Sequence, residues 1–196
     1  MMTAKSIQSL DRLYQSALNN NCRRPAEDAF VVSSLAYDNS LNDDKNRNLS
    51  KHLLVLSISS YLFRIITFFE FNKDAVTENY FRSNYISGNE DVLVSEHALL
   101  DAFSEFSNMV CGEVNRGLSS HFRHVGMSTP FFIAPGCLPF ITTLNRSNIR
   151  SFQVCINNTI GFNITSCICA DQSAHIDFHI GEAHFATVTT GDLELF

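Results

Sequence analysis

The sequence predicts an α+β fold in which a mainly antiparallel β-sheet carries long helices on one face. One observation is residues 95–122, where apolar side chains recur at helical spacing along a single long stretch. A second is a set of apolar stretches with the length and composition of strands, at residues 30–37, 52–71, 131–134, 148–157 and 162–169. The third is their order along the chain, which reads helix, strands, two helices and strands again.

Length and composition are those of one globular domain. A chain of 196 residues is long enough to bury a sizeable core, and we expect one domain over residues 1–196. Hydrophobic residues make up 45% of the chain and include 17 phenylalanines, a content that argues against a disordered chain. The formal net charge of −6, without a basic run, argues against nucleic acid and anionic membrane surfaces as main partners.

We expect neither a secretory leader nor a membrane span. The N-terminal residues lack an apolar stretch of signal-peptide length. The longest apolar run, residues 61–71, is interrupted by Arg64 and is too short to cross a bilayer. The six cysteines contain no C-x-x-C pair. We therefore expect them to be buried apolar residues of a cytoplasmic protein, with metal or redox roles as the alternative.

The first half of the chain begins with an expected helix at residues 6–18, whose apolar stripe is Ile7, Leu10, Leu13, Tyr14 and Leu18. Residues 30–37 are β-branched and aromatic and form the first expected strand. Residues 38–50 are polar and turn-rich, as in an exposed loop. Residues 52–71 are dense in leucine, isoleucine and phenylalanine, which predicts two strands, or one long bulged strand, with at least one buried face.

Two helices follow, and cap residues define their expected ends. Asn72 is the expected N-cap of a helix in residues 74–86, which Gly88 terminates. Ser95 is the expected cap of the long helix, and Glu96 lies in its first turn, where a carboxylate is favourable. After the long helix come the short strand at residues 131–134 and a hairpin of the two later strands. The C-terminal extension, residues 171–196, is expected to add one or two further strands.

One face of the long helix is polar and contains the candidate site. Its apolar stripe is Leu99, Phe103, Phe106, Val110 and Val114. At about 100° per residue, the opposite side gathers Asp101, Glu105, Asn108, Gly112, Asn115 and Ser119. Glu105 and Asn108 lie side by side, and Gly112, one turn beyond, leaves a bare surface that a partner's backbone can approach. A Glu-x-x-Asn pair alone is expected by chance in this chain, so its neighbours decide its meaning.

Together with its flanking segments, this helix resembles the CheX branch of the CheC/CheX/FliY family of chemotaxis phosphatases. The family signature is E-x-x-N among small residues with a glycine shortly after, and residues 105–112 read EFSNMVCG. The strand pair before it reads HLLVLSISSYLFRIITFFEF and precedes a helix that ends near Gly88, as in the family. After it, MSTPFFIAPG resembles the family's T-P-x-x-x-x-G strand, and GFNITSCI resembles its closing strands. The resemblance covers residues 49–170, and the helix and strand of residues 1–48 fit more loosely.

Two features depart from the family pattern. Ser60, Tyr61 and Arg64 stand where the family has glycines in the turn or bulge of the first strand pair. Residues 171–196 have no counterpart in the family. The chain contains one E-x-x-N in the family's context, which is similar to CheX and differs from the two-site arrangement of CheC and FliY.

The resemblance implies a phosphatase that hydrolyses the aspartyl phosphate of a CheY-like response regulator. The phosphorylated receiver brings its own Mg²⁺, so we expect no cofactor of the protein's own. Asn108 is expected to hold the attacking water, since a carboxamide both donates and accepts hydrogen bonds. Glu105 is expected to pair with the receiver's lysine. Gly112, Asp101 and Asn115 are the candidate partner contacts, and a homodimer is expected as well.

Two other functions stay open. A non-catalytic module on the same fold would bind a receiver, or dimerise, without turnover. A metal-dependent activity would use His175, Asp177 and His179, which share one face of an extended strand, with His184 close by. No other residues in the sequence complete such a metal site, so we expect none. For Asp101 and Asn115, the simpler interpretation is a solvated helix face.

Overall fold

The helices and strands occur in the order that the sequence predicts. The computed structural model describes residues 2–24, 28–35, 51–86, 96–137, 144, 148–170 and 173–181. The helices in these residues are α1 (Ala4–Asn21), α2 (Ala75–Tyr85) and α3 (Glu96–Ser119). The strands are β1 (Phe30–Leu35), β2 (Lys51–Ser59), β3 (Phe63–Asn72), β4 (Gly126–Met127), β5 (Phe131–Ile133), β6 (Asn148–Ile156) and β7 (Ile160–Ala170).

The strands form one antiparallel sheet in the spatial order β1-β6-β7-β3-β2-β4, and β5 also pairs with β2. β6 and β7 pair with each other, so the predicted hairpin is confirmed. Its turn contains Asn157 and Asn158 at φ 52° and 56°, a backbone conformation that asparagine adopts more readily than most residues. For residues 52–71 the sequence predicts two strands or one long bulged strand. The structure contains two separate strands, β2 and β3.

The turn between β2 and β3 closes without glycine. The backbone N–H of Ser60 donates to the carbonyl of Phe63 at 2.9 Å. The Ser60 hydroxyl oxygen in turn accepts a hydrogen bond from the N–H of Leu62 at 3.1 Å. A serine side chain that bonds the backbone two residues on is a common way to stabilise a tight turn. The absence of the family's glycines is therefore compatible with a regular strand pair.

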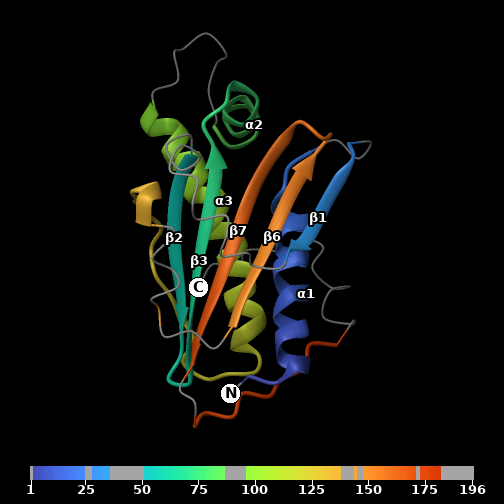
Figure 1. The fold of residues 1–196 in the computed structure, drawn as a ribbon, viewed down its shortest axis with the longest axis vertical. Coiled ribbons are helices and arrows are strands. Elements are labelled where there is room, and N and C mark those ends of the chain that lie inside the picture. Colours follow the sequence, from blue (N-terminus) through green and yellow to red (C-terminus); the bar gives the residue numbers. More distant parts are fainter. Residues whose placement is uncertain are drawn as a thin grey trace, which may run out of the picture.

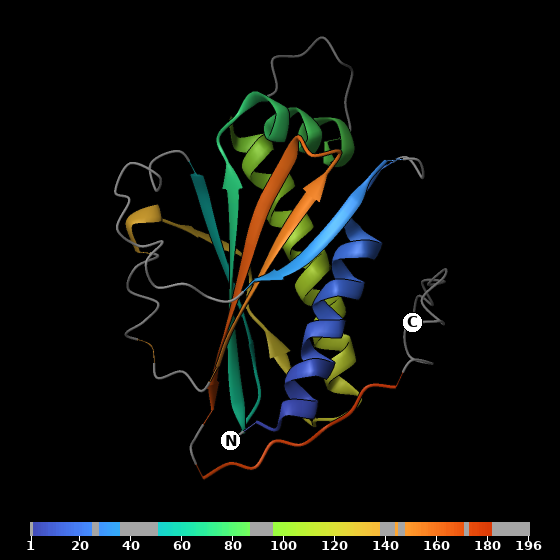
Figure 2. The ribbon, with the colours of Figure 1, turned by 45° about the vertical axis from the view of Figure 1, so that its right-hand side comes forward.

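Helices α1 and α3 lie side by side on one face of the sheet, and α2 lies at one end of it (Figures 1 and 2). Side chains alternate between the two faces along each strand. Leu54, Leu56 and Ile58 of β2 belong to the main core beneath the helices. Leu53 and Val55 belong to a smaller apolar cluster on the opposite face. The predicted fold class, α+β with long helices on one face of an antiparallel sheet, is confirmed.

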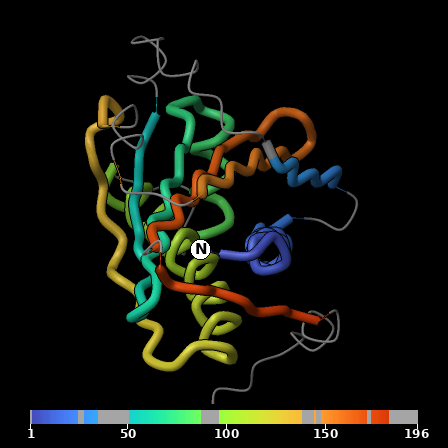
Figure 3. Tube along the Cα trace, turned by 60° about the horizontal axis from the view of Figure 1, so that its bottom comes forward, coloured from blue at the N-terminus to red at the C-terminus, as the bar shows by residue number. Residues whose placement is uncertain are grey.

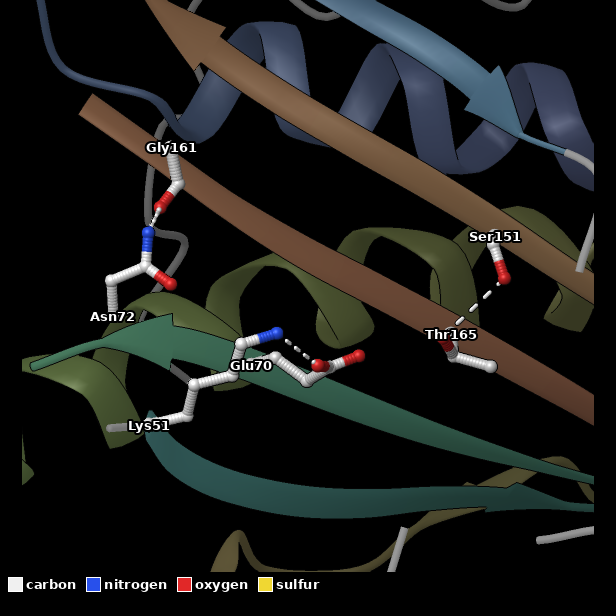
Figure 4. Close-up of polar contacts among 6 residues, drawn as sticks. All are labelled: Lys51, Glu70, Asn72, Ser151, Gly161 and Thr165. Carbon is white, nitrogen blue, oxygen red and sulfur yellow. Dashed lines mark hydrogen bonds and ion pairs between the residues drawn. The ribbon is translucent and has the colours of Figure 1, made fainter. Parts of the chain in front are cut away.

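The face of the sheet away from the helices carries polar pairs (Figure 4). Lys51 donates to the carboxylate of Glu70 at 2.7 Å, and Glu70 is largely buried. The hydroxyls of Ser151 and Thr165 lie 3.4 Å apart on neighbouring strands. These contacts satisfy polar groups on a face that also carries the smaller apolar cluster.

The N-cap of α2 is Asp74 and not Asn72. The Asp74 carboxylate accepts a hydrogen bond from the backbone N–H of Thr77 at 2.8 Å. Asn72 instead ends β3, and its side-chain amide donates to the carbonyl of Gly161 in β7 (Figure 4). Asparagine and aspartate are both good N-cap residues. Because β3 stays paired up to Asn72, the helix begins after it and Asp74 is its cap. The predicted cap Ser95 and the predicted terminator Gly88 lie outside the described residues.

The C-terminal extension does not join the sheet within residues 173–181. The ladder contact that the structure describes there is an isolated parallel bridge between Met2 and Ile176. The predicted further strand is therefore wrong for this stretch. The physical reason is that serine hydroxyls of α1 take the backbone hydrogen bonds that a neighbouring strand would take. Residues 182–196 lie outside the described residues, as does the predicted loop at residues 38–50.

Candidate functional site

The apolar side of α3 is fixed in the core by phenylalanine rings. The predicted stripe is fully buried and consists of Leu99, Phe103, Phe106, Val110 and Val114. The ring of Phe103 stacks on Phe71 of β3 with 4.2 Å between centroids. The ring of Phe106 meets Phe162 of β7 edge-on at 5.3 Å. Such aromatic pairs contribute beyond the area they bury, and they set the rotation of α3 about its own axis.

Helix α1 covers one flank of α3. A Cβ atom at Gly117 would lie 2.4 Å from Leu13 Cδ2, so the two helices approach closely at this glycine. Further along, the side-chain amides of Asn20 and Asn21 donate to the Glu113 carboxylate at 2.8 and 3.0 Å. Glu113, which the sequence places at the edge of the apolar stripe, is thus a structural residue between the helices.

The candidate residues lie on the side of α3 away from α1. At about 100° per residue, Asn108 is about 180° around the helix from Gly117. Glu105 and Asp101 are exposed, and Asn108 is half-buried. Around Gly112 the surface is open, since an added Cβ would meet only the Arg116 guanidinium at 3.9 Å. The structure therefore brings Glu105 and Asn108 together on an outward face next to a bare patch of helix.

Asn115 sits deeper than a solvated side chain would. The residue is half-buried, and its Oδ1 atom is fully buried without a hydrogen-bond partner among the described residues. The sequence places Asn115 in line with Asp101 on the polar face, whereas the structure buries part of the Asn115 side chain. An unpaired buried carbonyl oxygen is uncommon in folded proteins.

Behind the site lies a polar cluster that the sequence does not reveal. The hydroxyls of Tyr14 and Thr67 lie 2.6 Å apart, and Ser166 donates to Tyr14 at 3.4 Å. Cys111 of α3 is completely buried next to Thr67, and this burial raises the pKa of its thiol to about 12. Ser107 is also buried, and its hydroxyl has no partner among the described residues. This cluster brings together side chains of α1, the sheet and α3.

The cysteines differ in how far their side chains are buried. Cys22, Cys111 and Cys167 are buried, as the sequence predicts. Cys155 is half-buried and Cys137 is exposed, so the expectation of a buried residue is wrong for Cys137. Cys137 follows the short edge strand β5, where no helix or strand covers it within the described part of the chain.

His52 is a second residue near α3 that the sequence does not single out. Its ring lies 5.4 Å from Phe103 and 6.4 Å from Phe132, between the core and the sheet edge. Burial lowers the pKa of His52, and the positive charge of Lys73 lowers it further. Phe132 and its neighbour Phe131 are 36% and 51% exposed, so this edge is unusually aromatic for a surface.

The two described histidines of the C-terminal extension are at the surface. His175, Asp177 and His179 are exposed and alternate with buried apolar residues, in agreement with a shared face. Within the described residues, no group of three or more histidine, cysteine or acidic side chains is arranged to hold a metal ion. His184 lies outside the described residues. In the same part of the chain, no helix is both long and apolar enough to cross a membrane.

Known structures share this arrangement of helices and sheet. The CheX protein in a CheX–CheY–BeF3–Mg²⁺ complex from Borrelia burgdorferi matches with a TM-score of 0.60 at 8% identity, covering 83% of this chain and 97% of that chain. CheX from Vibrio vulnificus matches with a TM-score of 0.55 at 14% identity, covering 81% of this chain and 98% of that chain. No family model and no curated protein matches the amino-acid sequence. At the level of fold, the resemblance to CheX is confirmed.

Proposed function

We propose that this protein is a phosphatase that hydrolyses the aspartyl phosphate of a response-regulator receiver domain. The observation that supports the proposal most is the Glu105–Asn108 pair, which faces outward from a helix whose other sides are packed against the sheet and α1. The fold around this pair is that of a CheX protein that was crystallised together with CheY. A receiver is therefore the partner that the fold favours.

The proposed reaction needs positioning more than it needs a strong base. An acyl phosphate is an activated species, and the receiver's own Mg²⁺ supplies charge neutralisation when the receiver is bound. The Asn108 carboxamide accepts one hydrogen bond from a water and donates another to a phosphoryl oxygen, which orients the water in line with phosphorus. Half-burial of Asn108 limits its rotamers and suits this orienting role.

Docking is the proposed role of the remaining face. Glu105 is exposed and three residues before Asn108, so its carboxylate reaches a partner's lysine while Asn108 reaches the phosphoryl group. The open surface at Gly112 lets a partner's loop approach α3 closely. Asp101 and Asn115 flank this surface at either end. Together they define one continuous candidate contact along α3.

The test is the lifetime of the phosphate on a purified CheY-type receiver that has been loaded with a small acyl-phosphate donor. We expect the wild-type protein to shorten this lifetime, and we expect Asn108→Ala to abolish the acceleration, a loss of about 100-fold in rate. Asn79→Ala is the matched control, because Asn79 is exposed on α2 and is not one of the residues that α2 buries. Glu105→Gln is expected to raise the KM for the receiver more than it lowers kcat.

A non-catalytic receiver-binding module on the same fold predicts a different outcome of this assay. Such a protein would bind the phosphorylated receiver and leave the phosphate lifetime unchanged. Full activity of Asn108→Ala would reject the proposed role of Asn108. A homodimer also stays a prediction, and light scattering of the purified protein checks it. The exposed β1 edge, with Val31 52% accessible, is one surface available for such pairing.

A further inference from the structure

Residues 175–180, here called the strap, cross the N-terminal half of α1 in an extended conformation. Figure 3 shows this segment in red, passing the blue end of α1 near the C-terminal end of α3. Its side chains alternate, with one set exposed and the other set buried against the protein. The buried set is Ile176, Phe178 and Ile180, which are 0%, 6% and 1% exposed. The strap therefore presents an apolar-x-aromatic-x-apolar pattern to the surface beneath it.

The backbone of the strap is held by hydroxyl groups of one helix. The N–H of Phe178 donates to Ser6 Oγ at 2.8 Å, and the Ser6 hydroxyl lies 3.3 and 3.2 Å from the carbonyls of Ile176 and Phe178. Two residues further along the strap, the N–H of Ile180 donates to Ser9 Oγ at 3.2 Å. Ser6 and Ser9 are one helical turn apart and match alternate residues of an extended chain.

The start of α1 adds two more contacts. The N–H of Thr3 donates to the carbonyl of Ile176 at 3.1 Å. The Thr3 hydroxyl donates to the Asp177 carboxylate at 2.8 Å. Thr3 is also the N-cap of α1. The strap is thus tied to the residue at which this helix begins.

The aromatic side chain of the strap reaches the end of α3. The ring of Phe178 lies 5.6 Å from His121 and 5.2 Å from Phe122, which follow α3 in the chain. Phe122 in turn meets Phe63 of β3 at 5.0 Å. Phe178 therefore fills the space where α1, the exit of α3 and the sheet meet.

Helix α1 also has contacts with the sheet that do not involve the strap. Helix α1 is held independently by the Arg150 guanidinium on the Asp11 carboxylate, at 2.8 and 2.5 Å, and by Tyr14 on Thr67. If the strap detached, the Ser6 and Ser9 hydroxyls would form hydrogen bonds with water, so neither would be buried without a partner. The strap has no strand partner among the described residues beyond the single bridge to Met2.

We propose that Thr3, Ser6, Ser9, His121 and Phe122 form a peptide-binding surface, and that its resident ligand is the chain's own strap. The ligand class is an extended segment with apolar, aromatic and apolar residues at alternate positions. Recognition has two parts: the hydroxyl groups hydrogen-bond to the extended backbone, and the space beside Phe122 accommodates the aromatic ring. The inference is independent of the proposed phosphatase activity, because its contacts lie around the C-terminal end of α3 and away from Asn108.

The test uses the full chain with Phe178→Ala, which weakens the resident strap, and a synthetic peptide of residues 174–181. We expect hydrogen exchange at the strap amides of Phe178→Ala to rise at least about 30-fold. We expect the wild-type peptide to bind this variant and to slow exchange in the first turns of α1. A peptide carrying Phe178→Ala should not bind. The His179→Ala chain is the control, since His179 is exposed, and it should exchange like the wild type.

A folded Phe178→Ala chain that exchanges like the wild type would overturn the proposal, and so would one that fails to bind the wild-type peptide. If Phe178→Ala does not fold, Ile180→Ala carries the same test with a smaller loss of apolar contact. Binding of the peptide to the intact wild-type chain at equal affinity would also contradict the inference, because the resident strap should compete with it.

Discussion

At the scale of single residues, His52 shows how the surroundings of a side chain change its pKa. Its ring lies between the buried Phe103 and the exposed Phe132. Burial and then Lys73 lower its pKa, while Glu78 and Glu96 act in the opposite direction. The neutral imidazole is therefore the form that fits this position.

His52 predicts a pH dependence of stability. Because the folded-state pKa lies below the unfolded value of about 6.5, the unfolded chain binds a proton first as the pH falls. This contribution to the free energy of unfolding is complete above about pH 6.5 and is lost as the pH falls from there towards the folded-state pKa. We expect His52→Gln to flatten this part of the profile in thermal melts. His97→Gln, at an exposed position on α3, should leave the slope as it is in the wild type; equal slopes in both variants would contradict the account.

At the same scale, residue spacing predicts much of the candidate site. Helical periodicity places Asp101 and Glu105 on the face opposite Phe103 and Phe106, and both are exposed. It does not predict that the Asn115 oxygen is buried, because spacing along one helix does not show what packs over a given position. Nor does it find His52, whose ring neighbours come from α3 and β5.

At the scale of elements, the two glycines of α3 have opposite surroundings. Gly112 faces open space on the candidate site, whereas Gly117 faces Leu13 of α1. A glycine within a helix is less favourable than alanine by up to about 1 kcal/mol. Alanine substitutions at the two positions therefore report separately on helix propensity and on packing in the same helix.

We expect Gly112→Ala to raise the free energy of unfolding by up to about 1 kcal/mol, because nothing obstructs the added methyl group. We expect Gly117→Ala to lower it, since the Cβ would lie 2.4 Å from Leu13 Cδ2 and Leu13 is buried. Overpacking of this kind typically costs about 1–3 kcal/mol. Urea unfolding of both variants measures the difference. A change in the same direction at both sites would argue against the described packing of α1 on α3.

The sequence is least informative about where each helix or strand ends and about which segment it packs against. The pattern predicts the helix after β3, but the choice between Asn72 and Asp74 as its cap depends on how far β3 stays paired. The predicted shared face of His175, Asp177 and His179 agrees with the structure, in which all three are exposed and the residues between them are buried. This alternation cannot tell a strand partner from the serines of a helix, because both accept hydrogen bonds from the same backbone groups.

At the scale of the whole molecule, the arrangement explains why one face of α3 points outward. The sheet covers one side of α3, α1 covers a flank, and the strap closes the far end. Within the described residues, the outward side of α3 from Asp101 to Gly112 is exposed or half-buried. The fold class follows from hydrophobic periodicity, since that periodicity fixes which side of each element is buried. The spatial order of the strands comes only from the structure.

We propose that Asn108 acts on the phosphoryl group of a bound receiver. The most direct measurement is the rate of phosphate loss from a phosphorylated CheY-type receiver at saturating concentrations of this protein, where docking no longer limits the rate. We expect fast loss with the wild type and with Asn79→Ala, and a return to the receiver's own slow rate with a folded Asn108→Ala that still binds. Equal rates for wild type and Asn108→Ala at saturation would contradict it.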